Sequence, residues 1–277
     1  VQPSLPLQPA AGQATLALSD SDYHGFRGYE RARTALATAR RTLPNHAEVF
    51  AYTGYFNRRE GHWEEATNNQ ERAVELDPRN FFTLQELAST YGMQRRYADE
   101  VRTYDRALTI VPGDPATRIY RAQVALDWRS DIKPYQTMLA TLVAEDPSVA
   151  PDVDYPDYAL CERTAAAAAR LLTNYPRDGV VNYGVNFPHA YWEGVVARWQ
   201  GDSAKAQVAF AAAREELEKT LEKQADFPAA LSLLATIDAG LGRREEALRE
   251  GRRSCERLPV SQDSSGGTHL AANRAHI

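Results

Sequence analysis

The sequence predicts an all-α fold, a right-handed superhelical solenoid of about seven helix-turn-helix hairpins without a β-sheet. Two observations support this. The first is a set of four prolines, Pro44, Pro78, Pro112 and Pro147, at spacings of 34, 34 and 35 residues. The second is the pattern between Pro44 and Pro78, where apolar residues recur at helical spacing on both sides of one glycine. An interval of this kind is typical of two helices joined by a turn.

The unit 47–80 shows the pattern most fully. Residues 47–60 are expected to form its first helix, which ends at Gly61 because glycine tolerates the positive φ of a helix end. Residues 63–76 form its second helix, and Pro78 prevents that helix from continuing. Small side chains allow the two helices to approach closely, at Gly54, Ala66 and Ala73.

These residues also carry a resemblance. The unit resembles a tetratricopeptide repeat, whose pattern is W-x2-L-G-x2-Y, then G, A-x3-F, A and P. Phe50 occupies the tryptophan position, and five further positions match: Gly54, Gly61, Ala66, Ala73 and Pro78. Asn57 and Gln70 depart at the two aromatic positions. The next unit, from Phe81, departs at Glu100, where a small residue is expected, so its hairpin should be less tightly packed.

Extending this register along the chain predicts its organisation. We expect an N-terminal tail, three repeats, a stretch of degenerate helical hairpins, two further repeats and the start of another repeat, over residues 1–12, 13–114, 115–186, 187–261 and 262–277. Several phrases, such as R-R-E-G-H-W-E-E-A, are similar to repeat arrays appended to bacterial signalling proteins.

The resemblance also implies a binding surface, because the first helices of tetratricopeptide arrays line a concave face. Carried over by position, the peptide-binding residues are Tyr52, Tyr55, Arg58, Arg59, Phe82, Gln85, Glu86, Ser89, Tyr191, Trp192, Arg198 and Trp199. Aromatic and arginine side chains anchor interfaces, and arginine forks onto carboxylates, so an extended acidic segment is the expected ligand. The alternative is that the tyrosines pack against the neighbouring hairpin. The lysine and asparagine that clamp a chaperone's C-terminal carboxylate in some members are absent, so that ligand is not expected.

No constellation for catalysis is present. The chain lacks the phosphate-binding glycine loops, the nucleophile elbow and the H-E-x-x-H motif, and its 6 histidines are scattered. We therefore predict no enzyme activity, no cofactor and no metal. The acidic stretch 145–157 is interpreted as a solvated loop, and Cys161 and Cys255 as isolated buried thiols.

The net charge of −5 argues against nucleic-acid binding, and no apolar run reaches the ~18 residues of a membrane span. We predict a protein- or peptide-binding scaffold. The alternative is a regulatory, ligand-sensing segment of a multidomain signalling protein such as a cyclase, kinase or transcription regulator. The cytoplasm is the expected compartment, with the periplasm as the alternative. The sequence gives no prediction of the oligomeric state.

Overall fold

The computed structural model describes residues 29–182, 184–275 and 277, with side chains from residue 33 onward. The expected tail 1–12 and the first helix of the unit 13–46 lie outside these residues. The described chain forms two compact units that divide between Asp131 and Ile132. Each unit is helical and has its own hydrophobic core.

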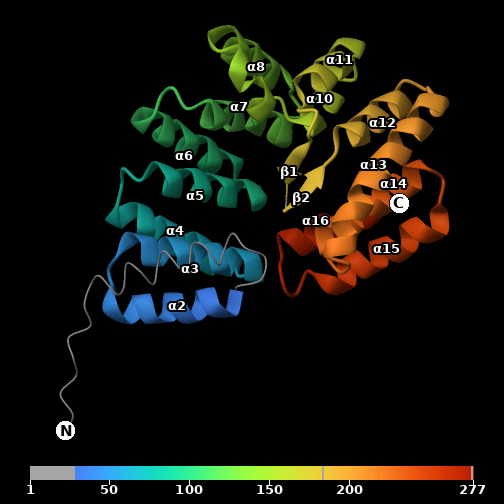
Figure 1. Ribbon diagram of the computed structural model, residues 1–277. Coiled ribbons are helices and arrows are strands. Elements are labelled where there is room, and N and C mark those ends of the chain that lie inside the picture. The colour runs from blue at the N-terminus through green and yellow to red at the C-terminus, as the bar shows by residue number, and fades with distance from the viewer. Residues whose placement is uncertain (1–28, 183, 276) are drawn as a thin grey trace. The chain divides into compact units, whose positions relative to one another are not determined.

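The first unit is a stack of helices in sequence order (Figure 1). Its helices are α2 (Tyr29–Thr42), α3 (Ala47–Glu60), α4 (Trp63–Leu76), α5 (Phe81–Met93), α6 (Tyr97–Ile110) and α7 (Pro115–Arg129). Helices α3 and α4 pack as one hairpin and α5 and α6 as the next, while α2 packs on α3 and α7 on α6. The bounds of α3 and α4 are those predicted for the unit 47–80.

Local chemistry sets the helix ends. Asn80 accepts a hydrogen bond from the backbone N–H of Thr83 (3.0 Å) and caps α5, and Asp114 caps α7 in the same way through Thr117 (2.7 Å). Helix α3 ends at Gly61 with φ 79°, in the left-handed region that side chains disfavour. In the turn between α5 and α6, Arg95 takes this conformation with φ 58°.

The second unit begins with short, irregular elements and ends with two long hairpins. Its elements are α8 (Lys133–Glu145), η1 (Pro147–Val149), α9 (Ala150–Val153), α10 (Pro156–Cys161), α11 (Ala165–Asn174), β1 (Val180–Asn182), β2 (Val185–Phe187), α12 (His189–Trp199), α13 (Ser203–Lys223), α14 (Pro228–Gly240), α15 (Arg244–Arg257) and α16 (Gly266–Ala275). Helices α12 and α13 form one hairpin and α14 and α15 the other, with α16 packed on the last pair.

The expectation of a chain without β-structure was wrong in one place. Strands β1 and β2 form an antiparallel pair in which Val180 lies opposite Phe187 and Asn182 opposite Val185. Gly179 (φ 80°) and Gly184 (φ 74°) take the backbone conformations that begin and turn this short pair. β-Branched Val180, Val181 and Val185 favour extended backbone. The prediction missed this local preference because it extended the helical repeat pattern over these residues.

In the acidic stretch 145–157, Glu145, Asp146, Asp152 and Asp157 are exposed, as predicted for a solvated loop, and Asp154 is the exception. The Asp154 side chain is fully buried, where its Oδ2 accepts hydrogen bonds from Arg170 Nε (2.8 Å) and Asn174 Nδ2 (3.1 Å). Glu162 contacts the same guanidinium. The positive charge that compensates Asp154 comes from α11, 16 residues further along the chain, so local composition did not reveal it.

The phenol of Tyr135 fixes this segment to α8. Its hydroxyl donates to the Val153 carbonyl (3.1 Å) and accepts from the Tyr155 N–H (3.2 Å). Helix α7 ends at Ser130 (φ 56°) in the first unit, and α8 of the second unit packs on η1 and α9. Both cysteines are free as predicted, but neither is buried: Cys161 is exposed because α10 ends there, and Cys255 is half-buried.

One aromatic ring joins the two long hairpins of the second unit. Phe210 on α13 is fully buried between two glycines, Gly194 on α12 and Gly240 on α14. A Cβ at either glycine would come within 2.7 Å of the ring. The distances between α12, α13 and α14 are therefore set by the Phe210 ring and by the absence of a Cβ at the two glycines.

The left-handed turn at Gly61 predicts a local cost for a side chain. Gly61→Ala should lower the free energy of unfolding by about 1–2 kcal/mol, because an L-residue is strained at positive φ. Gly113→Ala is the matched control, since nothing lies within 4 Å of the added Cβ, and it should leave stability unchanged or slightly raised. Urea unfolding followed by circular dichroism measures both, and equal effects would show that the turn geometry is not limiting.

The short elements between α8 and α12 predict where proteases act first. Limited digestion with proteinase K should cut within residues 147–187 before 47–112, because α9 and α10 have only 4 and 6 residues and the β1 strand is exposed. Mass spectrometry of the early fragments identifies the cut. First cleavage within α3 to α6 would mean that the regular hairpins are the less stable part.

Candidate functional site

The twelve predicted binding residues fall in both units. Eight lie on α3 and α5 of the first unit, and four lie on α12 of the second.

In the first unit, the aromatic residues form a connected cluster. Tyr55 is buried, and its ring makes edge contacts with Tyr52 (5.6 Å between centroids) and Phe82 (6.4 Å). Burial raises the pKa of the Tyr55 hydroxyl above its usual value, and the nearby Glu86 carboxylate adds to the shift. Phe82 is the outermost member, with half of its surface (50%) exposed. The alternative interpretation, packing against the next hairpin, thus describes Tyr55, while Phe82 remains accessible.

Arg58 has a structural partner. Its Nη2 lies 2.6 Å from Glu86 Oε2, and its Nη1 donates to Thr90 Oγ1 at 3.0 Å. The guanidinium carbon also lies 5.7 Å from the centroid of the Tyr55 ring. Since the side chain is buried, Arg58 connects α3 to α5 rather than presenting a free guanidinium to a ligand. Arg59, next in the chain, is half-buried.

Gln85 connects the next pair of helices. Its Nε2 donates to Thr117 Oγ1 (2.6 Å) and to Asp114 Oδ2 (3.4 Å), which are at the start of α7. Ser89 lies one turn further along α5 and is half-buried. Of these predicted inward-facing residues of α5, Gln85 thus contacts the next repeat, while Ser89 remains partly accessible.

These side chains border a groove of about 780 Å³ along α5, α6 and α7. The groove contains four of the predicted residues together with nine that were not predicted. It is lined by Phe82, Gln85, Glu86, Ser89, Gly92, Met93, Tyr97, Glu100, Tyr104, Ala116, Tyr120, Gln123 and Asp127. Phe82 and Met93 are both about half exposed at its edge. An accessible apolar edge beside polar groups is the usual composition of an interaction surface.

Glu100 lies deep in this groove. Its side chain occupies the space over Gly92, where an added Cβ would be 2.6 Å from Glu100 Oε1. Only 8% of the residue is exposed, and Oε2 has no hydrogen-bond partner among the described residues. Burial, helped by the charge of Asp127, raises the pKa of the Glu100 carboxyl from 4.5 to about 7. The sequence had marked Glu100 as a departure from the repeat pattern, but only as a packing defect.

Gln123, on the α7 side of the groove, is in a similar state. It is 7% exposed, and its Nε2 has no hydrogen-bond partner among the described residues. Buried polar groups without partners are rare in folded proteins and cost stability. Two of them in one groove therefore indicate a surface suited to a ligand.

In the second unit, the predicted residues divide into core and surface. Tyr191 packs against Phe187 (6.0 Å), Trp192 (4.8 Å) and Phe210 (6.3 Å), and burial raises its pKa to about 12. Trp192 is buried as well. Arg198 and Trp199, at the end of α12, are exposed. Only these last two remain available to a partner.

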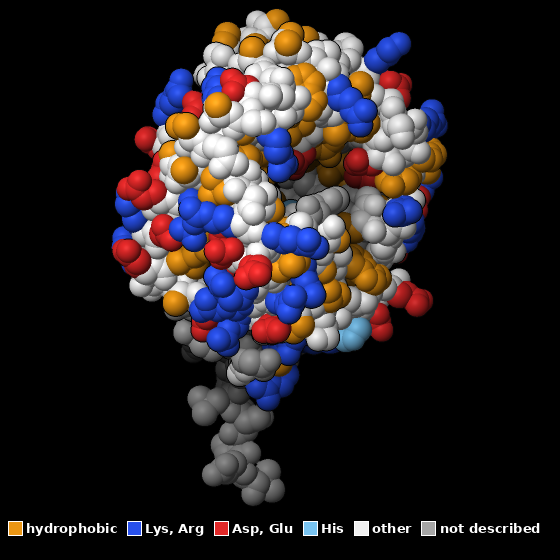
Figure 2. Space-filling view, turned by 90° about the vertical axis from the view of Figure 1, so that its right-hand side faces the viewer, with side chains coloured by type: hydrophobic (Ala, Val, Ile, Leu, Met, Phe, Trp, Pro, Cys, Tyr) orange, Lys and Arg blue, Asp and Glu red, His pale blue; other side chains and the backbone are white. Residues whose placement is uncertain are grey.

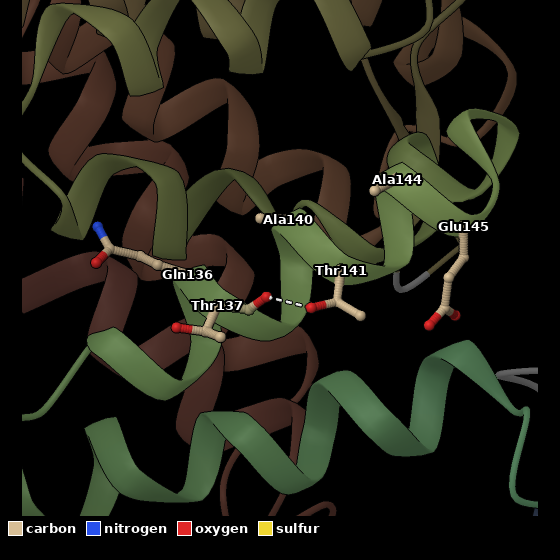
Figure 3. A pocket seen from close by; sticks show the side chains of 6 residues that line it. All are labelled: Gln136, Thr137, Ala140, Thr141, Ala144 and Glu145. Atoms are coloured by element: carbon tan, nitrogen blue, oxygen red, sulfur yellow. Dashed lines mark hydrogen bonds between the residues drawn. The ribbon is translucent and has the colours of Figure 1, made fainter.

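A second hollow lies on α8, also in the second unit. Gln136, Thr137, Ala140, Thr141, Ala144 and Glu145 line it from one face of the helix (Figure 3). Thr141 Oγ1 donates to the Thr137 carbonyl at 2.9 Å, an ordinary contact within the helix. Four of its six lining residues are alanine or threonine, and Glu145 is the one charged group among them.

The described residues hold no group of three or more histidine, cysteine, aspartate or glutamate side chains that could bind a metal ion. None of the helices from α2 to α16 is both long and apolar enough to cross a membrane. On the face in Figure 2, basic side chains lie among acidic ones rather than in one continuous basic patch.

Comparison with known proteins identifies the architecture. No family model matches the chain, and no curated protein matches its sequence. Among solved structures, it is similar to a tetratricopeptide repeat protein from Parabacteroides merdae, with 14% identity and a TM-score of 0.55 over 96% of this chain and 99% of the other. It is also similar to yeast Tom70, with 15% identity and a TM-score of 0.60 over 96% of this chain and 55% of the other.

The chain is thus an all-α solenoid of helical hairpins. Its hairpins have the fold of tetratricopeptide repeats, as the sequence pattern predicted. At these identities, the likeness concerns the fold alone.

The buried carboxyl of Glu100 predicts an unusual dependence of stability on pH. A raised pKa means that the folded chain binds this proton more tightly than the unfolded chain does, so stability falls as the pH rises from 4.5 to 7. Glu100→Gln should remove this loss and raise the free energy of unfolding by about 2–3 kcal/mol at pH 8, with little effect at pH 4. Denaturant unfolding at both pH values measures it. The exposed Glu64→Gln is the control, and an equal gain from it would contradict a burial effect at Glu100.

Proposed function

We propose that this chain is a protein-interaction scaffold whose first unit binds an extended segment of a partner protein in the groove along α5, α6 and α7. The observation that carries the proposal is the groove itself, in which the exposed edge of Phe82 and Met93 borders buried polar groups that lack partners. The tetratricopeptide-repeat fold supports it, because stacked helical repeats create extended surfaces that suit peptides. A non-catalytic role is part of the proposal.

An acidic segment, the ligand expected from the sequence, fits exposed residues of the second unit but not Arg58 of the first. Arg58 already pairs with Glu86, so it has no free guanidinium to offer a carboxylate. Arg198 and Trp199 are exposed and combine a cation with a large ring. We propose that an acidic segment would bind there, without nucleic-acid binding or membrane insertion by either unit.

The cellular setting is a separate proposal. The similarity of the repeat phrases to arrays of bacterial signalling proteins supports a bacterial origin, and the alternative function is a ligand-sensing segment beside a cyclase, kinase or transcription-regulator domain. The exposed free thiol of Cys161 favours the reducing cytoplasm over the periplasm. Alkaline phosphatase fusions distinguish the two compartments.

Peptide selection tests the groove. The full chain, immobilised, should enrich binders from a randomised dodecapeptide library displayed on phage. Phe82→Ala should weaken the selected peptides by about 2 kcal/mol, the scale of an interface hot spot, with little change in melting temperature because half of the ring is exposed.

Val208→Ala is the matched control, since Val208 is a 73% exposed apolar residue on α13 of the other unit. Failure to enrich any peptide above bare support would argue against the proposed function. Equal weakening by Phe82→Ala and Val208→Ala would show that the peptides do not bind in the groove.

A further inference from the structure

The groove of the first unit is lined by acidic side chains and by no basic ones. Its thirteen lining residues include the carboxylates of Glu86, Glu100 and Asp127, and no lysine or arginine. Arg58 compensates Glu86 across 2.6 Å. Glu100 and Asp127 have no hydrogen bond or ion pair to a basic side chain among the described residues. A ligand that carries positive charge would supply what these two groups lack.

Aromatic rings surround the same space. Tyr104 and Tyr120 lie with their ring centroids 6.2 Å apart, and Tyr97 stacks on Trp128 at 6.0 Å. Trp128 does not line the groove, but its ring already accepts a cation, since the Arg129 guanidinium carbon lies 4.3 Å from its centroid. Aromatic faces beside a carboxylate are the recurrent environment of bound ammonium and guanidinium groups.

Glu100 is the group in the groove that most needs a positively charged partner. Its carboxylate is more than nine-tenths buried, faces the groove and has one oxygen without a partner, at a position where the repeat pattern expects a small residue. Such a group destabilises the folded chain unless something binds to it. A metal ion is not the fitting occupant, because the described residues offer no cluster of three ligating side chains.

We propose that this groove binds a lysine or arginine side chain of an extended partner segment, with Glu100 as its buried counter-ion and Asp127 at the rim. Tyr97, Tyr104 and Tyr120 flank the cation, and Gln123 Nε2 donates to a carbonyl of the same segment. The inference rests on the proposed function, and it names the side chain that the groove selects.

The peptide library tests this through the sequences it yields. Selected peptides should share one lysine or arginine, and replacing it with norleucine should weaken binding about tenfold or more, the scale of a lost hydrogen bond to a charged group. Glu100→Gln should weaken the same peptides to a similar extent. Glu64→Gln makes an equal change of charge on α4, which does not line the groove, and should not weaken them. Circular dichroism confirms that both variants are folded.

The pH dependence of binding is a second readout. Binding of a selected peptide to the wild-type chain should strengthen between pH 6 and pH 8, because the Glu100 proton must leave for the ion pair to form. The other ionisable groups around it are Asp127 from α7, Glu86 from α5 and the tyrosines of the groove. The pH dependence should disappear in Glu100→Gln.

The outcomes separate the two proposals. Peptides that bind in the groove without a shared cation, or with a shared acidic residue, would overturn the cation inference and leave the scaffold intact. If Glu100→Gln still prefers peptides with a lysine or arginine, the cation inference is also overturned, because a group other than Glu100 would then bind the positive charge. If no peptide is enriched at all, both proposals fail.

Discussion

Close approach of paired helices is the constraint on which the rest of this structure depends. In the hairpin of α3 and α4, a Cβ at Gly54 would lie 2.6 Å from Gln70 Cγ and 2.9 Å from the Ala66 carbonyl oxygen. Ala66 and Ala73 are fully buried at the same seam. Because the two helices are this close, the hairpin packs as one rigid unit. The next repeat then needs only to stack on that unit.

Contacts between successive repeats then decide which inward-facing side chains are free. Arg58 reaches Glu86 and Thr90 of the next repeat, and Gln85 reaches Thr117 of the one after. Both residues occupy positions that face a ligand in the family pattern, yet here they connect helices. In the first unit, the surface that we propose for a partner is therefore narrower than the pattern implies, and it follows α5, α6 and α7.

The sequence predicted the parts of the fold that local chemistry sets. Gly61 and Pro78 mark helix ends because backbone conformation and a missing N–H act within a few residues, so the bounds of α3 and α4 followed directly. The β1–β2 pair and the buried Asp154 did not follow, because strand pairing and the ion pair with Arg170 depend on residues brought together by folding. Glu100 was visible as an exception, but its significance depends on Gly92, Gln123 and Asp127 around it.

The ring of Phe210 has a consequence for how this protein can change over time. It is in contact range of two positions, 194 and 240, that are far apart in sequence and on different helices. A larger residue at either glycine is tolerable only after the ring has become smaller, and a smaller ring leaves a cavity unless one of the glycines has already grown. The three positions are thus epistatic, and substitutions at them are expected to arise together or in a restricted order among descendants of this chain.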